Sequence, residues 1–233
     1  MKEHRRVPPD VGPWREQHRV TAVYTTADGS RGSRIGLAFQ FGVHVATTGA
    51  RAASFQAAVE FDLGLSQPIL LATDEIPMPV NGWEFRTSGL WADHNCETAF
   101  EHWSYGLEAF ALGIEDRAEL LGRGYGDRTP LGWELDFEAR FDLTSVDPVA
   151  TSLEGYAQTG RLHGIIQFVD GEVEIDGPAT RWHWWGVGAM DGSPLLGVAA
   201  DRTVALPTPD GVWWVDPLRI GSSSSPNDEG SGR

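Results

Sequence analysis

The most unusual segment of the chain is the hexapeptide RWHWWG that begins at Arg181. Side chains on a β-strand alternate between two faces. One face would then carry Arg181, His183 and Trp185, and the other Trp182 and Trp184. An imidazole beside a guanidinium can bind a ligand or transfer a proton near neutral pH. A core histidine that satisfies a buried partner is the alternative, but two polar heads beside an indole favour the wall of a ligand pocket.

A second candidate strand is Cys96–Leu112, which reads CETAFEHWSYGLEAFAL. Alternation along one continuous strand would gather on one face Glu97, Glu101, Trp103 and Tyr105. If that face points inward, a carboxyl group against indole loses hydration, which raises its pKa and makes it a proton donor at neutral pH. If it points outward, the two glutamates are ordinary solvated charges. Periodicity does not distinguish the two orientations.

Other chemistries have little support in the sequence. The seven histidines show no His-x-His, His-x-x-x-His or Cys-His spacing, so no metal is expected. The chain has no G-x-G-x-x-G that opens a helix, no G-x-x-x-x-G-K-[ST] and no G-x-S-x-G, so we expect neither a nucleotide cofactor nor serine hydrolase chemistry. Exposed tryptophans can stack on sugars, which leaves a carbohydrate-binding module as a minor alternative.

The formal net charge of −15 argues against two classes of partner. Such a field repels phosphate backbones and anionic headgroups, so neither nucleic acid nor a membrane is expected. The start of the chain, MKEHRRVPPD, lacks the apolar stretch of a signal peptide. The single Cys96 cannot form an internal disulfide, which agrees with a reducing compartment. We therefore expect a cytoplasmic protein. The sequence does not determine its oligomeric state, and a homodimer is one option.

The folded part is expected to cover about residues 14–220. The two ends, 1–13 and 221–233, have little apolar area to bury and predict flexible tails. Between them, apolar residues recur at period two and turn residues are frequent, which is typical of strands. The expected strands are Arg19–Thr26, Arg34–Thr48, Ser54–Asp62, Gly82–Ala92, Cys96–Gly113, Gly132–Phe141, Tyr156–Val169 and Glu172–Ile175.

Three local signals refine this pattern. In Ile165–Ile175, Asp170 and Gly171 are expected to form the two-residue loop of a hairpin, because Asp-Gly supplies the positive φ that such loops need. Only Ile114–Leu121 reads as a helix. The stretch Asp74–Gly82 contains two prolines and is the best internal boundary if the chain has two halves. Together these features predict an all-β antiparallel protein, closed into a barrel that avoids open edges and encloses a central apolar pocket.

From Tyr156 to Gly186 the chain resembles the C-terminal half of the family of carotenoid 1,2-hydratase (hydroxyneurosporene synthase) and AttH-like proteins. The family has a Gln-x-Gly-x-x-x-Gly strand, a hairpin and an Arg-Asp-His-Ser-Trp-Gly segment. The matching residues are Gln158, Gly160, Gly164, Arg181, His183, Trp185 and Gly186. Upstream, ETAFEHWSYG is similar to an acidic, tryptophan-containing strand of the family, with Trp103 at the tryptophan.

The resemblance implies a lipocalin-like β-barrel, as one compact barrel or two trimmed halves, and an activity that needs no redox cofactor. Family members hydrate isoprenoid double bonds or cyclise polyketide or polyene chains. The chain departs from the family at Trp182, where the family has Asp, and at Gly188 and Ala189, which replace Arg-Asp. The N-terminal part is also too short for a second full barrel. The loss of the Asp argues against acid catalysis at that position.

These observations predict a cofactor-independent cyclase, isomerase or hydratase that folds an apolar unsaturated polyketide or isoprenoid inside the barrel. A pericyclic, Diels-Alderase-like cyclase falls within this class. The expected catalytic residues are His183, Arg181, Glu97 and Glu101. The expected substrate-binding residues are Trp103, Tyr105, Tyr156, Gln158, Trp182, Trp184 and Trp185. The alternative is a non-catalytic lipocalin-like carrier of an apolar small molecule, whose pocket would hold no titratable group.

Overall fold

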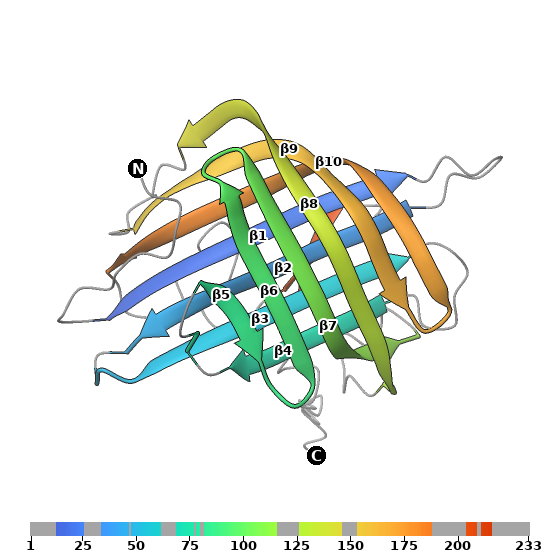
Figure 1. Cartoon of the computed structure of the whole chain (residues 1–233). Helices are drawn as coiled ribbons and strands as arrows, with labels where there is room; N and C mark the ends of the chain where they lie inside the picture. Colours follow the sequence, from blue (N-terminus) through green and yellow to red (C-terminus); the bar gives the residue numbers. More distant parts are fainter. Residues whose placement is uncertain are drawn as a thin grey trace, which may run out of the picture.

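The computed structural model is an all-β protein built around one closed barrel (Figure 1). It describes residues 13–25, 34–46, 48–61, 69–76, 78–79, 82–115, 126–145, 153–187, 204–208 and 211–215. The strands are β1 (Trp14–Thr25), β2 (Arg34–Val45), β3 (Arg51–Phe61), β4 (Ile69–Ile76), β5 (Trp83–Arg86), β6 (Leu90–Thr98), β7 (His102–Ile114), β8 (Arg128–Ser145), β9 (Leu153–Phe168), β10 (Gly171–Val187), β11 (Val204–Thr208) and β12 (Gly211–Val215).

Eight of the strands close the barrel. The hydrogen-bonded order is β4-β3-β2-β1-β10-β9-β8-β7-β6-β5, and an additional pairing joins β4 to β7. This pairing uses only the end of β7, where Ile69 lies opposite Ile114 and Leu71 opposite Leu112. The other half of the same β7 edge pairs with β6, so the β5–β6 hairpin extends the sheet beyond the point of closure. All pairings are antiparallel, which confirms the predicted lipocalin-like barrel in the first of its two expected forms, one compact barrel.

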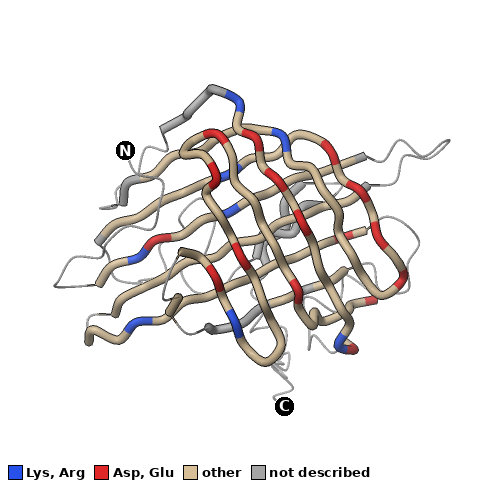
Figure 2. The backbone as a smooth tube through the Cα atoms, in the orientation of Figure 1, with Lys and Arg blue, Asp and Glu red and all other residues tan. Residues whose placement is uncertain are grey.

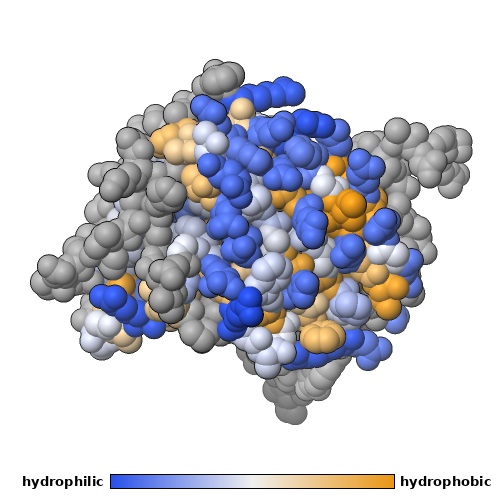
Figure 3. All heavy atoms as spheres, viewed as in Figure 1, coloured by the Kyte–Doolittle hydropathy of each residue, from blue (hydrophilic) through white to orange (hydrophobic). Residues whose placement is uncertain are grey.

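The period-two pattern explains which side chains fill the interior. From residue 103 to 107 on β7 and from 129 to 137 on β8, every second residue is buried, including Trp103, Tyr105, Trp133 and Phe137, while their neighbours are more exposed. The outer face of β5 to β10 is rich in Asp and Glu (Figure 2). The same face is largely hydrophilic, with separate hydrophobic patches (Figure 3). The sheet therefore has an aromatic inside and an acidic outside, as alternation requires.

The outer face of β1, β2 and β3 is different, because many of its side chains are buried as well, including Arg19, Gln40 and Gln56. Strand β11 of the separate β11–β12 hairpin lies next to these three strands. On that face Arg19 donates a hydrogen bond to Gln40 over 2.8 Å, and Gln40 donates to Gln56. Burial lowers the pKa of Arg19 to about 9. This side of the barrel is thus a second packed layer.

Two strands predicted as continuous are each divided by a turn. The predicted Gly82–Ala92 strand is β5 and the start of β6, with the Thr87 amide donating to the Leu90 carbonyl between them. The predicted Cys96–Gly113 strand is the end of β6 and then β7, separated by a turn in which Phe100 has a φ of 64°. Both predictions were wrong because neither turn contains an Asp-Gly or Asn-Gly pair, the dipeptides that mark tight hairpins in a sequence.

The predicted hairpin at Ile165–Ile175 is confirmed, with its loop one residue earlier than expected. Phe168 pairs with Gly171, so the two loop residues are Val169 and Asp170. Gly171 has a φ of 148° and opens β10. The glycine supplies the unusual backbone angle, but as the first residue of the returning strand.

Several predictions fall on residues that the structure does not describe. Both predicted tails lie outside the described residues, apart from Pro13. Of the predicted helix, the residues after Glu115 lie outside them as well, and Ile114 is the last residue of β7. The proposed boundary at 74–82 covers the last three residues of β4 and the connection to β5, of which residues 77, 80 and 81 are outside the described part. Among the described residues, no helix has the length and hydropathy to cross a membrane.

Candidate active site

Three neighbouring strands bring a set of polar side chains into the barrel. In the registers of β1 with β10 and of β10 with β9, His18 lies opposite His183, which in turn lies opposite Tyr156. Two residues further along the same strands, Arg181 lies opposite Gln158. All these residues are buried, and His183 and Arg181 are fully so. Strand pairing thus joins residues from the two ends of the described barrel in one interior cluster.

A hydrogen-bonded chain runs through His183. Its Nε2 lies 2.8 Å from Oε1 of Glu16, and its Nδ1 lies 3.1 Å from the hydroxyl of Tyr156. A carboxylate only accepts hydrogen bonds, so the imidazole proton sits on Nε2 and Nδ1 accepts from the tyrosine hydroxyl. The order Glu16, His183, Tyr156 is therefore a carboxylate that orients an imidazole, and an imidazole that can take a proton from a phenol.

Arg181 adds the positive charge of the cluster. Its Nη1 donates to Gln158 Oε1 over 2.5 Å, and both Nη atoms lie within 3.5 Å of the Tyr156 hydroxyl. The guanidinium also lies over the Trp103 ring, with its carbon 4.4 Å from the ring centroid. Gln158 is itself held by donating to the Phe100 carbonyl over 2.9 Å. A guanidinium beside a phenol oxygen stabilises negative charge there, and Arg181 and Glu16 supply opposite charges to the same buried cluster.

His18 lies between aromatic rings on the same interior face. It stacks on His183 with centroids 3.8 Å apart, and on Phe41 at 4.8 Å. Arg181 Nη2 lies 3.4 Å from His18 Nδ1, and His18 Nε2 lies 3.7 Å from Glu16 Oε1. His18 thus supports the Glu16 and His183 pair from the side.

The same three residues are the metal-ligand group found among the described residues. Glu16, His18 and His183 each offer one ligand atom, and these atoms lie within 4.8 Å of one another. Two histidines and a carboxylate can bind Zn²⁺ or Fe²⁺. The two imidazole planes, however, are only 19° apart, so their in-plane lone pairs cannot converge on one ion. The adjacent Arg181 also repels a cation. The observed arrangement fits hydrogen bonding better than metal binding.

The structure brings together most of the residues that the sequence selected. Inside or facing the barrel are Arg181, His183, Trp185, Trp103, Tyr105, Tyr156 and Gln158. The predicted alternation of the RWHWWG segment is confirmed, and it places Trp182 and Trp184 on the opposite face. Trp184 is buried there, with the Arg19 guanidinium 5.7 Å from its ring. These two tryptophans therefore do not line the interior.

Glu97 and Glu101 lie away from the cluster and are exposed. Glu97 accepts a hydrogen bond from Ser104 over 2.9 Å, and Glu101 lies in the turn before β7. The turn breaks the alternation, so neither glutamate shares the inward face of Trp103 and Tyr105. With solvent around them, they lack the desolvation on which their proposed acid role depended.

The carboxylate of the cluster is Glu16, which the sequence analysis missed together with His18. The predicted first strand began only at Arg19, although β1 starts at Trp14. Extending the alternation back from Val20 places His18 and Glu16 on the inward face. This alternation could have predicted the inward positions of both residues. It was overlooked because the inward face of a strand is usually recognised by apolar residues, and His18 and Glu16 are polar.

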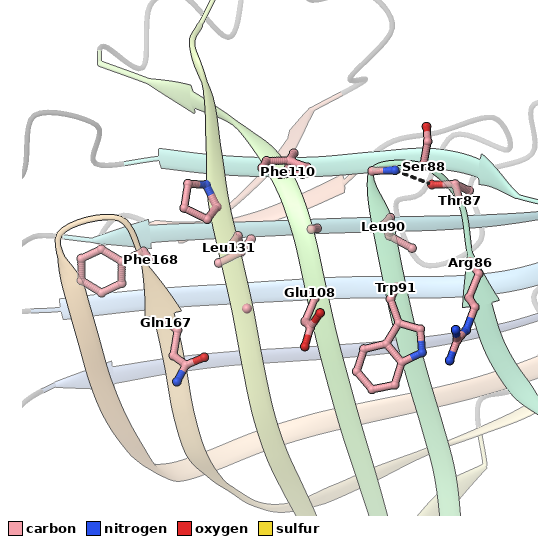
Figure 4. A pocket seen from close by; sticks show the side chains of 14 residues that line it. Arg86, Thr87, Ser88, Leu90, Trp91, Glu108, Phe110, Leu131, Gln167 and Phe168 are labelled. Atoms are coloured by element: carbon pink, nitrogen blue, oxygen red, sulfur yellow. Dashed lines mark hydrogen bonds between the residues drawn. The ribbon is translucent and has the colours of Figure 1, made fainter.

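The outer wall carries a separate groove of about 750 Å³ across β5 to β9. Trp91 on β6, Glu108 on β7 and Gln167 on β9 lie in one row across it, with Gly132 of β8 between the last two, and Phe110 lies at one end (Figure 4). Trp91 donates a 3.5 Å hydrogen bond to Glu84. None of the predicted site residues lines this groove, so it is distinct from the interior cluster.

Fold and cluster together define a lipocalin-like antiparallel β-barrel with a buried Glu-His-Tyr-Arg network. No family model matches the chain, and no curated protein matches its sequence. Among solved structures, the chain is similar to a protein from Nitrosomonas europaea that is provisionally assigned as AttH. The two are 10% identical over 89% of this chain and 69% of that one, with a TM-score of 0.49. At this level of similarity, nothing about activity or ligand follows from the likeness.

Proposed function

We propose that the protein is a cofactor-independent enzyme that moves a proton on an apolar, unsaturated substrate held inside the barrel. The observation that carries this proposal is the buried chain from Glu16 through His183 to Tyr156, with contacts of 2.8 and 3.1 Å. A purely structural core has little use for a carboxylate, an imidazole and a phenol in series, because burying each of them costs free energy. Sites that transfer protons need such groups in this order.

In the proposed reaction Tyr156 exchanges the proton with the substrate. His183 takes the hydroxyl proton at Nδ1, and Glu16 stabilises the imidazolium through Nε2. Arg181, within 3.5 Å of the hydroxyl, stabilises the phenolate. The phenolate then removes an activated carbon-bound proton from the substrate. Return of a proton at another carbon completes an isomerisation, and protonation of a double bond by the same relay would begin a cyclisation or a hydration.

The aromatic interior would supply the rest of the catalysis. Trp103, Tyr105, Phe39 and Phe41 are all buried on inward positions. Such rings exclude water, impose a folded conformation on a flexible chain and stabilise positive charge that develops on it, by about 0.5–2 kcal/mol for each desolvated ring. These contributions require no metal or redox group.

The second candidate is a carrier of an apolar molecule. The extent of the buried aromatic interior favours it, since binding alone needs no proton relay. The two candidates differ in what they require of Tyr156, because a carrier should keep its ligand affinity without the hydroxyl.

The test starts with the apolar molecule that copurifies with the protein, identified by solvent extraction and mass spectrometry. This compound is then incubated in D₂O with the wild type, with Tyr156→Phe and with the exposed control Glu97→Gln. We expect deuterium incorporation or a converted product with the wild type and the control, and at least about 100-fold less with Tyr156→Phe. Binding without any conversion by the wild type would favour the carrier.

A further inference from the structure

Three buried polar groups on the barrel interior take no part in the Glu16 cluster. They are the imidazole of His94 on β6 and the indole N–H groups of Trp83 on β5 and Trp133 on β8. No more than 3% of any of these residues is exposed. None of the four nitrogen atoms, two of them on His94, has a hydrogen-bond partner in the described part of the structure.

The three residues share one aromatic neighbourhood. Trp83 and His94 are directly opposite each other across the β5–β6 pair. Phe41 lies 4.3 Å from His94 and 5.2 Å from Trp83, between ring centroids. Phe39 connects His94 to Trp133 at 6.0 and 5.1 Å. The unpaired groups therefore belong to one region of the interior.

This region adjoins the candidate active site. Phe41 stacks on His18, whose other face stacks on His183. Trp83 also lies 5.0 Å from His18. A ligand that reaches from the Trp83 and His94 pair to Tyr156 would pass along these rings. The interior thus has two polar poles, one hydrogen-bonded within the protein and one not.

Leaving a buried donor or acceptor unsatisfied is costly, so natural cores contain few such groups. Burial also lowers the pKa of His94 to about 3, and the Asp93 backbone acts against this shift. The ring is therefore neutral at physiological pH, with one N–H donor and one acceptor nitrogen. With the two indole N–H groups, the three residues offer three hydrogen-bond donors and one acceptor. Such a set is suited to bind an oxygen atom that accepts hydrogen bonds.

We infer that Trp83, His94 and Trp133 form a second pole of the substrate site, which binds a carbonyl or hydroxyl oxygen of the substrate. The inference rests on the proposed function and narrows it, because it selects oxygenated chains over pure hydrocarbons. The oxygen anchors the chain at this pole, and its unsaturated part lies toward Tyr156. An indole or imidazole N–H on a carbonyl oxygen would also acidify the neighbouring carbon-bound protons that the Tyr156 relay removes.

The test compares two probes of the same chain length, the aldehyde farnesal and the hydrocarbon farnesene, by equilibrium binding. We expect the wild type to bind farnesal at least about tenfold more tightly, the equivalent of about 1.4 kcal/mol. His94→Phe keeps ring bulk and Trp83→Phe keeps an aromatic ring, so each should abolish most of this preference and leave the farnesene Kd within about threefold of the wild type. Tyr156→Phe is the matched control, and it should keep the preference.

Thermal unfolding gives a second readout. Replacing an unsatisfied buried imidazole with phenyl should raise the Tm of the ligand-free protein by about 2–6 °C. A lowered Tm would mean that His94 is satisfied by ordered water or protein, and would overturn the inference. Equal affinity of the wild type for both probes would overturn it as well. A wild type that prefers farnesal but converts no substrate would contradict only the proposed enzyme activity.

Discussion

The imidazole rings of His18 and His183 stack with centroids 3.8 Å apart and planes 19° apart, although they come from the first and tenth strands. In this arrangement Glu16 can hydrogen-bond to His183, but the two rings cannot direct lone pairs at one ion. We therefore expect that neither EDTA nor equimolar Zn²⁺ changes the Tm by more than about 1 °C. A metal that bound the folded state would raise the Tm with concentration, and such a rise, lost in Glu16→Gln, would show that the rings reorient into a metal site.

Glu16 and Glu97 form a matched pair for testing the relay. Glu16→Gln keeps the shape but removes the charge that orients His183 and balances Arg181. We expect turnover to fall at least about 100-fold and stability to fall by about 3 kcal/mol, because a buried cation loses its counter-charge. Glu97 is exposed, so Glu97→Gln should change stability by less than about 0.5 kcal/mol and leave turnover unchanged. If Glu97→Gln lowered turnover as much as Glu16→Gln, the acid group of the reaction would not be specific to the barrel interior, and the relay would be contradicted.

The pH dependence of stability should report on His94. Its pKa of about 3 in the folded protein is below the ordinary value of 6.5, so between these values the unfolded chain binds a proton that the folded protein excludes. Stability therefore falls as pH falls through this window, with a contribution of up to about 1.4 kcal/mol per pH unit. The denaturant-derived free energy of His94→Phe should decline less steeply than that of the wild type between pH 6 and 4. Parallel curves would show that His94 is protonated in the folded state.

Gly164 on β9 has a structural role that its place in the Gln-x-Gly-x-x-x-Gly pattern could conceal. Its φ is +138°, and a Cβ there would lie 2.0 Å from the Glu134 carbonyl oxygen on β8. Gly164→Ala should therefore destabilise the barrel by more than about 2 kcal/mol, seen as a lower Tm. The surviving folded fraction should retain normal ligand affinity. A stable Gly164→Ala variant with impaired binding would instead assign this glycine to the site.

The barrel could be predicted from the sequence because alternation and turn residues are local signals. The hairpin at 165–175 and the two faces of Arg181–Gly186 followed directly from them. The turns at Thr87–Gly89 and Ala99–Glu101 were not predicted. The alternation of apolar and polar residues before each turn resumes after it, so the sequence resembles one continuous strand. Because of the second turn, Glu97 does not share a face with Trp103 and Tyr105, as one continuous strand would require.

The site was predictable only in part, because its residues meet through non-local pairing. His183 and Arg181 were selected by their unusual aromatic neighbours. Glu16 had no such marker, and only the register of β1 with β10 brings it to His183. A single sequence contains no record of that register.

The central claim is that His183 takes the hydroxyl proton of Tyr156 while Glu16 stabilises the resulting imidazolium, and turnover of the His183→Phe variant tests it most directly. Phenylalanine keeps the ring that stacks on His18 and packs near Trp185, at a centroid distance of 4.7 Å in the wild type. We predict a folded protein whose turnover of the copurifying substrate is at least about 100-fold lower, with a Kd within about tenfold of the wild type. Unchanged turnover together with a clearly lowered Tm would show that His183 is a structural core residue and would contradict the account.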